Sequence, residues 1–220
     1  MTEELKRYGL TITQAAFWLD VEPAYLAAAL DEEEYPQWLT YCFDCMDEEF
    51  EEDPAVFEYF RLGSQLHEGT WSAATAREAI PILIDRAKKG EIISYKDLDS
   101  ELRRLDPTRK SAGTLQKYGK PLGIVGDVIE EIRKEAEDGS STVSGRNAKL
   151  PPIEALVVRG REKLPGKGIN GFMTTYLTLF GENHAEDIML REHDRKKAVE
   201  RIQADIFAWD DWSVLERLAK

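Results

Sequence analysis

The chain has 220 residues, of which 42% are hydrophobic and 32% are charged. A chain of this length can form one large domain or two small ones, and it can bury roughly 70% of its unfolded surface. No apolar run approaches the ~20 residues of a membrane-spanning helix, and the acidic residues 1–4 do not resemble a secretory signal. Two cysteines are too few for a disulfide framework, so we expect a cytoplasmic protein in a reducing compartment.

The charge is unevenly distributed along the chain, whose net charge is −13. Residues 1–79 contain four basic and 18 acidic side chains, a net charge of −14, whereas residues 80–170 contain 18 basic and 14 acidic ones. Residues 171–220 contain seven basic and ten acidic side chains. Such asymmetry predicts separate modules with separate partners, and the middle segment could present a local basic face to phosphate groups.

The first segment has the pattern of an all-helical module. Apolar residues recur at helical spacing over residues 13–30, with a break at 19–21 and a proline, Pro23, placed to open a second helix. This pattern is typical of a helix-turn-helix. A DNA-reading helix offers basic or amide side chains, whereas this one offers Glu22, Tyr25 and alanines, followed by acidic residues. We therefore favour a helix pair that packs for its own stability over one that reads DNA.

The densest acidic stretch, residues 44–53, is interleaved with Phe43, Met46 and Phe50, which predicts an amphipathic helix with an acidic outer face. Such a face can simply be solvated, or it can bind a basic protein partner, including by imitating the charge of a nucleic acid. The residues expected to contact a partner are Asp44, Asp47, Glu48, Glu49, Glu51 and Glu52.

Cys42 and Cys45 form a single C-x-x-C pair, which is half of the ligand set of a structural zinc site. His67 is the nearest histidine in the sequence, while His184 and His193 lie far along the chain. The acidic surroundings of the pair do not suit a redox-active thiol. We therefore expect buried helical cysteines, with no metal and no cofactor.

The middle of the chain has the pattern of helices separated by two short strands, and the fold class expected for the whole chain is α+β and predominantly helical. The expected elements are a helix over 72–89, a strand over 92–95, a helix over 96–105, a basic loop over 106–119, a helix from Pro121, a Ser- and Gly-rich stretch over 137–149, a strand over 156–158, a glycine-rich turn over 164–171 and helices over 185–218.

Three segments of this region carry motifs in a recognisable order. Residues 91–98 contain Ile-Ile-Ser-Tyr at a strand-to-helix junction, residues 122–129 contain Leu-Gly-Ile-Val-Gly, and residues 151–158 contain Pro-Pro-Ile-Glu before a short strand. A turn with glycines follows at residues 165–168. This order resembles the DNA-binding domain of the methylguanine-DNA methyltransferases and the alkyltransferase-like proteins over about residues 72–172. The resemblance implies a winged-helix-like fold.

The same resemblance excludes alkyl transfer, because the residues that perform it are replaced. Ile153 stands where the family has its alkyl-accepting cysteine, and Glu154 stands where it has the activating histidine. The family's non-catalytic relatives bind DNA through a basic groove with a tyrosine near the recognition helix. The positions implied here are Arg103, Arg104, Arg109, Lys110, Lys117, Tyr118, Lys120, Arg159, Arg161, Lys163 and Lys167. Half of them could instead be ordinary surface cations paired with nearby carboxylates.

Other catalytic patterns are weaker. Residues 166–171 match G-x-G-x-x-G, but seven residues separate Gly166 from the preceding strand, so a turn with close backbone approach is the simpler interpretation. A metal-dependent nuclease needs converging carboxylates. Asp127, Glu130 and Glu154, with Lys149, could supply them if the fold brought these residues together.

Near the C-terminal end, Trp209 and Trp212 favour a tail clamped onto the body, and they could also seed a homodimer interface. We expect an acidic helical domain over residues 1–69, a winged-helix-like domain over 70–180 and packed helices over 181–220. The preferred function is a non-catalytic nucleic-acid-associated or regulatory protein with a phosphate-contacting middle domain and a partner-binding acidic domain. The alternatives are an acidic inhibitor or adaptor without nucleic-acid affinity, and a nuclease with an unrecognised active site.

Overall fold

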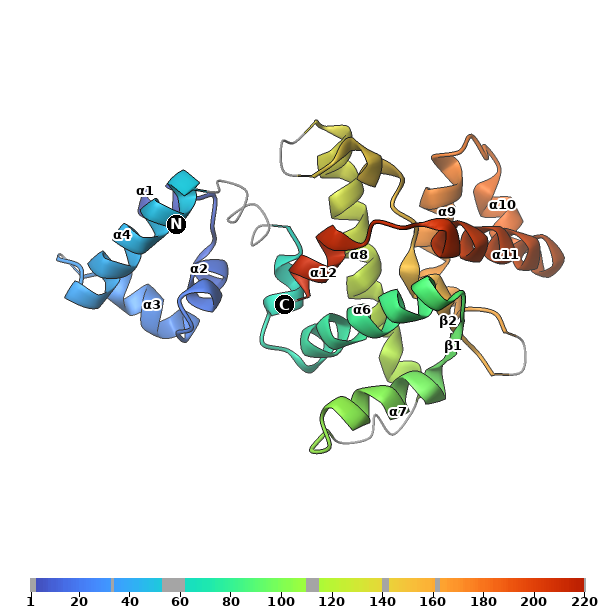
Figure 1. The fold of residues 1–220 in the computed structure, drawn as a ribbon, viewed down its shortest axis with the longest axis horizontal. Helices are drawn as coiled ribbons and strands as arrows, with labels where there is room; N and C mark the ends of the chain where they lie inside the picture. Colours follow the sequence, from blue (N-terminus) through green and yellow to red (C-terminus); the bar gives the residue numbers. More distant parts are fainter. Residues whose placement is uncertain are drawn as a thin grey trace. The chain divides into compact units, whose positions relative to one another are not determined.

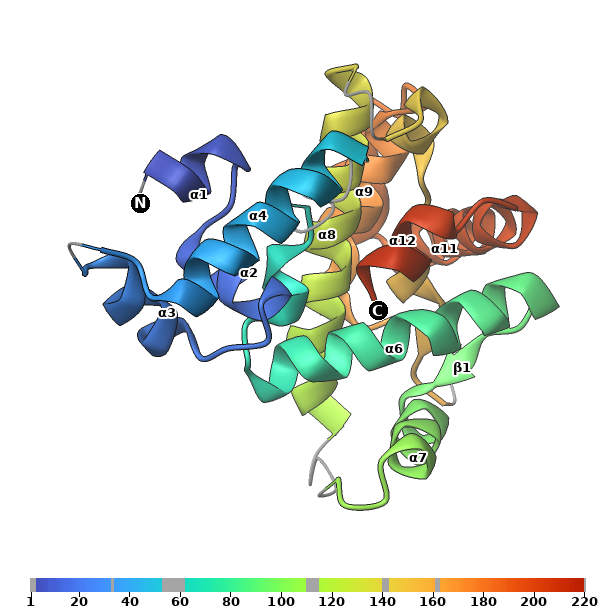
Figure 2. The same cartoon turned by 60° about the vertical axis from the view of Figure 1, so that its left-hand side comes forward.

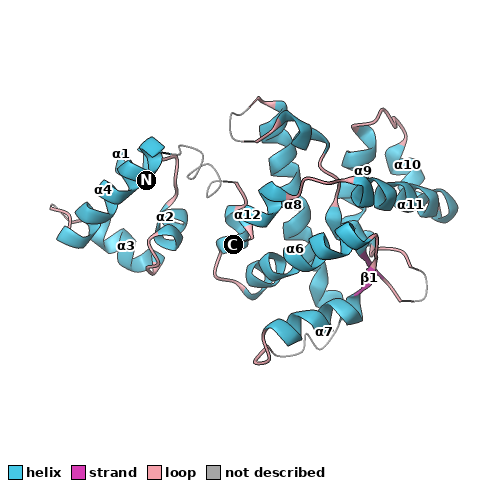
Figure 3. Ribbon diagram, in the orientation of Figure 1, coloured by secondary structure: helices cyan, strands magenta, loops and turns pink. Residues whose placement is uncertain are grey.

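The computed structural model describes residues 3–32, 34–52, 62–109, 115–139, 143–160 and 163–219. The chain divides into two compact units, Met1–Glu68 and Gly69–Lys220, which can be followed in Figures 1 and 2. Helices dominate the described residues, and the strands among them are two segments of two residues each (Figure 3). A predominantly helical α+β chain is therefore confirmed. No helix in these residues is both long and apolar enough to cross a membrane.

The described part of the N-terminal unit packs short helices around one apolar core. Its elements are α1 (Glu3–Arg7), α2 (Ile12–Trp18), α3 (Pro23–Leu30), α4 (Gln37–Glu52) and the 3₁₀ helix η1 (Ser64–His67). The side chains that are completely buried in this core are Leu5, Leu10, Ala15, Ala16, Leu26, Leu39 and Met46. Apolar positions from every α-helix thus converge, as their helical spacing predicts.

Helices α2 and α3 form the helix pair that the sequence predicts. Pro23 is the first residue of α3, where its fixed φ suits a helix start and its missing N–H leaves no bond unmade. In the connecting turn, Asp20 adopts a left-handed φ of 53°, a conformation that aspartate tolerates better than most residues. Ala15 and Ala16 on α2 are completely buried, and such small side chains allow the backbones of packed helices to approach closely.

Helix α4 is the expected amphipathic helix, with Met46 buried in the core and its acidic residues turned outward. Asp47 is the exception, because it accepts hydrogen bonds from the Tyr8 hydroxyl (2.5 Å) and from Arg7 Nη1 (3.1 Å). This carboxylate therefore links α4 to the first residues of the unit. Cys42 and Cys45 are free thiols on α4 and only half-buried, so the expectation of buried cysteines was wrong.

The C-terminal unit contains α-helices, short 3₁₀ helices and both strands. Its elements are α6 (Trp71–Lys89), β1 (Ile93–Ser94), α7 (Tyr95–Leu105), η2 (Leu115–Tyr118), α8 (Gly119–Glu137), η3 (Gly145–Lys149), η4 (Ile153–Leu156), β2 (Val157–Val158), η5 (Lys167–Ile169), α9 (Asn170–Thr178), α10 (Ala185–Leu190), α11 (Glu192–Ala208) and α12 (Ser213–Leu218). The two strands pair in parallel, with Ile93 opposite Val157 and Ser94 opposite Val158.

Helix α6 is bounded by local signals that the sequence shows. The Thr70 hydroxyl accepts a hydrogen bond from the Ala73 N–H at its start, and Gly90 ends it with a left-handed φ of 69°. Helix α8 packs against α6 in the core, with Val125, Val128 and Ile129 buried along its inner stripe. Gly126 on the same stripe faces Phe172 of α9 so closely that a β-carbon there would lie 2.5 Å from the ring.

The C-terminal helices belong to the same compact unit, and the two tryptophans hold the tail within it. Trp212 is only 1% exposed, and its indole N–H donates to the carbonyl of Trp209 (3.1 Å). The two rings meet edge to face with centroids 6.5 Å apart, while the guanidinium of Arg146 lies 4.8 Å from the Trp209 ring centroid. Trp212 is therefore buried within its own unit, whereas Trp209 is partly exposed.

Glu154 and Arg133 are among the charged side chains that are buried in the C-terminal unit. Glu154 on η4 is completely buried, and neither of its carboxylate oxygens has a hydrogen-bond partner among the described residues. Burial raises the pKa of Glu154 from its ordinary value of 4.5 to about 7, against the opposing effect of the Arg133 charge. Arg133 is 4% exposed and donates from Nε to the Leu150 carbonyl (2.7 Å). Its own burial lowers the pKa of this guanidinium.

We predict that Glu154 makes the stability of the protein depend on pH. The raised pKa means that the folded state keeps a proton that the unfolded state releases, so the free energy of unfolding should fall as pH rises from 4.5 to 7. At pH values above 7 the loss should approach about 3 kcal/mol. Urea unfolding of Glu154→Gln should lack this loss and give a higher stability than the wild type above neutral pH. Glu186→Gln, an exposed carboxylate on α10, is the control, and an equal pH dependence in wild type and Glu154→Gln would contradict the prediction.

Candidate functional site

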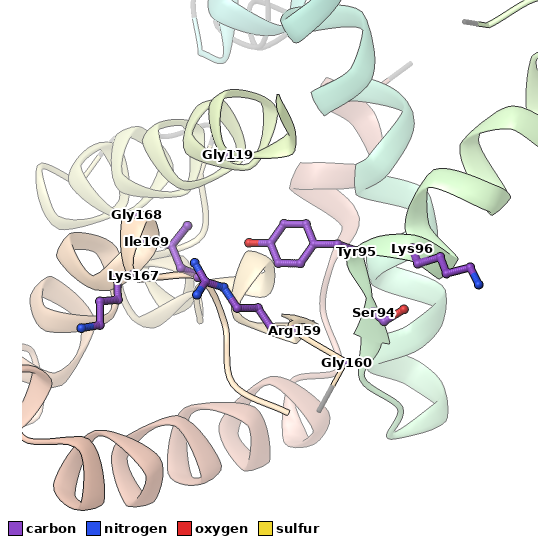
Figure 4. Close-up of a pocket in the computed structure, with 10 residues that line it drawn as sticks. Ser94, Tyr95, Lys96, Gly119, Arg159, Gly160, Lys167, Gly168 and Ile169 are labelled. Carbon is purple, nitrogen blue, oxygen red and sulfur yellow. The ribbon is translucent and has the colours of Figure 1, made fainter. Parts of the chain in front are cut away.

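A pocket of about 680 Å³ opens on the C-terminal unit where four segments meet (Figure 4). These segments are the β1–α7 junction, the first residue of α8, the residues after β2 and the 3₁₀ helix η5 with the glycine before it. The lining residues are Ser94, Tyr95, Lys96, Gly119, Arg159, Gly160, Gly166, Lys167, Gly168 and Ile169. The pocket therefore combines residues from widely separated parts of the sequence.

The strand register brings the two sides of the pocket together. Ser94 lies opposite Val158, so the residues that follow, Tyr95 and Arg159, leave the two parallel strands side by side. Ser94 also starts α7, because its hydroxyl accepts a hydrogen bond from the Asp97 N–H (3.1 Å). One serine thus ends the strand and begins the helix whose first residues line the pocket.

A hairpin-like turn after β2 returns the chain to the pocket. Val158 and Pro165 form an antiparallel bridge, and the Arg159 N–H donates to the Leu164 carbonyl (2.9 Å). Lys163 within this turn has a left-handed φ of 51° and donates its N–H to the Arg159 carbonyl (3.0 Å). The turn thus brings both Arg159 and Gly166 to the wall of the pocket.

Tyr95 and Gly166 are in direct contact at the pocket wall. A β-carbon on residue 166 would lie 2.9 Å from the Tyr95 hydroxyl oxygen. Burial raises the pKa of Tyr95, although Arg159 and Arg195 favour its ionised form. The hydroxyl therefore keeps its proton at neutral pH and can donate it to a bound group.

Arg195 of α11 is hydrogen-bonded to the residues on both sides of the glycine-containing segment 166–169. It is 5% exposed, and its Nη2 donates to the Pro165 carbonyl (2.8 Å) and to Asn170 Oδ1 (3.0 Å), which also accepts from Nε (3.0 Å). These bonds tie both ends of the segment that carries Gly166 and Lys167. Residues 165–170 are thereby fixed between α7 and α11.

The charge of the pocket is positive. Lys96, Arg159 and Lys167 line it, and none of the described lining residues is acidic. Figure 4 shows the Tyr95 hydroxyl directed toward the Arg159 guanidinium and Ile169, whereas the ammonium groups of Lys96 and Lys167 point outward at opposite ends. No salt bridge within the described part of the chain engages these three cations. A net positive hollow on a chain of charge −13 suits an anionic ligand.

Some of the predicted basic residues line this pocket, and others lie beside it or farther along α7. Arg159 and Lys167 line it, Lys163 lies on the turn between them, and Lys120 follows Gly119 in the first turn of α8. Lys117 is exposed on η2, just before α8, and Arg104 is exposed near the end of α7. The end of α7 is about 12 Å along the helix from Lys96, at 1.5 Å per residue. Two further predicted residues, Lys110 and Arg161, lie outside the described residues.

Three of the predicted contact residues have structural partners instead. Tyr118 is 1% exposed, and its hydroxyl donates to Asp99 Oδ1 (2.6 Å) inside the unit. Arg103 pairs with the other oxygen of Asp99, with Nη2 and Oδ2 2.7 Å apart. The side chain of Arg109 is 6% exposed and bonds Glu78 and the Thr75 hydroxyl of α6. Tyr118 thus joins η2 to α7, and Arg109 joins the loop after α7 to α6, so neither side chain belongs to the exposed surface. The Arg103–Asp99 pair lies within α7, and the Arg103 side chain stays 45% exposed.

The predicted partner-binding residues share one outer face of α4 in the N-terminal unit. Asp44, Glu48, Glu49, Glu51 and Glu52 are exposed, whereas Asp47 is partly covered and bonded to Tyr8 and Arg7. Five carboxylates thus remain accessible.

Three lining residues with polar side chains, Ser94, Tyr95 and Lys96, were not predicted as site residues from the sequence, and neither was Gly119. The signal for Tyr95 was present, because the Ser-Tyr pair at residues 94–95 is one of the motifs behind the resemblance described above. Tyr95 lines the pocket because the chain that returns after β2 lies against it, which is a tertiary contact. Lys96 carried no distinguishing signal, since isolated surface lysines are common.

The described residues offer little support for the catalytic alternatives. Ile153 and Glu154 are completely buried in η4. No group of three or more His, Cys, Asp or Glu side chains in the described residues is arranged to hold a metal ion. The glycines of residues 166–171 lie at the start of η5 and α9 and follow a turn, not a strand.

Comparisons with protein-family models, with curated proteins and with solved structures give no match to this chain. Its function is therefore inferred from the residues of the pocket and their surroundings.

We predict that Gly166→Ala will be destabilised through Tyr95. The added β-carbon would lie 2.9 Å from the Tyr95 oxygen but 3.9 Å from the ring carbon that bears it, so the hydroxyl is the obstacle. Urea unfolding should show a loss of about 1–2 kcal/mol for Gly166→Ala in the wild-type background. In a Tyr95→Phe background the same substitution should cost much less, which a double-mutant cycle would detect. Equal losses of stability in the two backgrounds would show that the clash with the Tyr95 hydroxyl is not the cause of the destabilisation.

Proposed function

We propose that the chain is a non-catalytic, nucleic-acid-associated protein of the cytoplasm. The C-terminal unit contacts phosphate groups through the pocket and the lysines beside it, and the acidic N-terminal unit contacts a basic protein partner. The observation that carries the proposal is the positive pocket, lined by Lys96, Arg159 and Lys167 without an acidic residue among those described. Proteins bind phosphate groups through exposed Lys and Arg side chains, which neutralise the phosphate charge.

The order of elements supports a winged-helix-like arrangement as part of this proposal. Helix α6 is followed by β1 and α7, then by α8, which corresponds in order to a recognition helix. The antiparallel bridge between Val158 and Pro165 closes a turn that corresponds to a wing. Lys120 in the first turn of α8 and Lys163 on the turn would then face the same backbone.

A second candidate function follows from helix α4. Its five exposed carboxylates form an acidic face in a segment that carries most of the negative charge of the chain. An inhibitor or adaptor that occupies the nucleic-acid site of a basic partner would use such a face and would need no nucleic-acid affinity of its own. The two candidates differ in whether the C-terminal unit binds an oligonucleotide.

The test of the preferred function is fluorescence anisotropy with labelled single- and double-stranded DNA and RNA at about 50 and 200 mM salt. Lys120→Glu and Lys167→Glu should each weaken binding and reduce the salt slope by roughly 0.7–0.9, because each removes a phosphate contact. Lys134→Glu is the matched control, because Lys134 is exposed on the last turn of α8, about 21 Å along the helix from Lys120.

Absence of binding by the wild-type protein at the lower salt concentration would refute the preferred function. In that case a lysine-rich peptide should bind the protein, and neutralising Glu48, Glu49, Glu51 and Glu52 to glutamine should abolish that binding if the second candidate is correct. Equal loss of oligonucleotide affinity in Lys120→Glu, Lys167→Glu and Lys134→Glu would show that net charge, not the pocket region, determines binding.

A further inference from the structure

The size of the pocket suits one small ligand. Its volume of about 680 Å³ falls in the range of small-molecule sites, roughly 300–1,000 Å³. A nucleic-acid strand that only lies across a protein surface contacts exposed side chains and requires no pocket. We propose that this pocket binds a phosphate monoester, the dianionic terminal phosphate of a nucleotide. The inference rests on the proposed function and deepens it, because it names the part of a nucleic acid that this pocket takes.

The centre of the pocket offers hydrogen-bond donors to a phosphate group. The Arg159 guanidinium can bind two phosphate oxygens at once, and in Figure 4 it lies on the side toward which the Tyr95 hydroxyl points. The Tyr95 hydroxyl can donate its hydrogen toward the ligand, because a phenolic O–H is both a donor and an acceptor. The arrangement therefore provides a charged fork and a neutral donor on the same side of the hollow.

The glycines let a ligand approach the backbone. A β-carbon at Gly119, Gly160 or Gly168 would meet no atom within 4 Å, so the space beside each of these residues is open. Gly119 begins α8 and Gly168 lies in η5, which leads into α9, and neither α8 nor α9 has a side-chain cap at its start. The N-terminal ends of these helices add partial positive charge to a pocket that already holds cations.

The number of cations favours a monoester over a diester. Lys96 and Lys167 stand at the two ends and Arg159 at the centre, whereas an internal phosphodiester carries one negative charge. A terminal phosphate carries close to two charges at neutral pH and three acceptor oxygens, as phosphorylated side chains do. The flexible lysines at the ends could bind the remaining charge or the next phosphate along a strand.

The ligand chemistry could come from two sources, a free nucleotide or the 5′-phosphorylated end of a strand. We would measure binding of the full-length protein to a 3′-labelled single strand with a 5′-phosphate and to the same strand with a 5′-hydroxyl. A nucleoside 5′-monophosphate and the corresponding nucleoside would be compared by calorimetry. The variants would be Arg159→Gln, Tyr95→Phe and the control Lys134→Gln, with thermal unfolding to verify that each is folded.

The expected result is that the wild type and Lys134→Gln bind the 5′-phosphate strand about tenfold or more tightly than the 5′-hydroxyl strand. Arg159→Gln should lose this preference, and Tyr95→Phe should reduce it. Arg159-dependent binding of the nucleoside monophosphate without binding of any strand would support the pocket assignment with a free nucleotide as ligand, and it would refute the proposed function.

Three results would overturn the inference. If both strands bind equally well and the monophosphate does not bind, the proposed function stands but the pocket does not take a terminal phosphate. If Arg159→Gln keeps the full preference for the 5′-phosphate strand, the phosphate is bound elsewhere. Absence of binding by every strand and by the monophosphate would overturn the inference and the proposed function together.

Discussion

Ser94 and Val158 lie opposite each other in two parallel strands of two residues each, and the pocket depends on this register. Adjacent strands lie ≈ 4.7–4.9 Å apart, so the next residues, Tyr95 and Arg159, leave the pair as close neighbours. A shift by one residue would turn their side chains to opposite faces. The pairing is short, but α7 and the turn after β2 extend from it, and Arg195 fixes the returning segment through Pro165 and Asn170. A small amount of sheet thus positions groups that are distant in the sequence.

The C-terminal unit places its charged groups according to two different requirements. Glu154 and Arg133 are buried with unsatisfied polar atoms, a costly arrangement that native interiors usually avoid. By contrast, Lys96 and Lys167 are exposed and unpaired among the described residues, so they retain their hydration until a ligand replaces it. The first pair makes the stability of the unit sensitive to pH, and the second makes its surface attractive to anions. The two effects can be separated by substitution, because the residues involved do not contact each other.

Helix positions were predictable wherever the signal is local. Thr70 and Gly90 mark the two ends of α6, and the apolar spacing of α8 identifies its buried stripe. The role of Tyr118 was not predictable, because its partner Asp99 lies nineteen residues earlier and only the packed structure brings them together. The same holds for Arg109, which reaches Glu78 of α6, so a basic residue in a polar loop became part of the interior. Residues of the pocket were found in part, since Arg159 and Lys167 lie in a segment rich in cations, whereas Tyr95 depends on tertiary contacts.

The hydrogen bond from the Arg159 N–H to the Leu164 carbonyl (2.9 Å) has a consequence for observing the protein in solution. A hydrogen-bonded amide exchanges its hydrogen for deuterium only when the local structure opens. Because this bond closes the turn after β2, the Arg159 amide should exchange only when the turn itself moves. Its exchange rate therefore reports how often the pocket wall opens. A ligand that binds in the pocket would slow the exchange of this amide, and a ligand that binds elsewhere on the chain would leave the exchange rate unchanged.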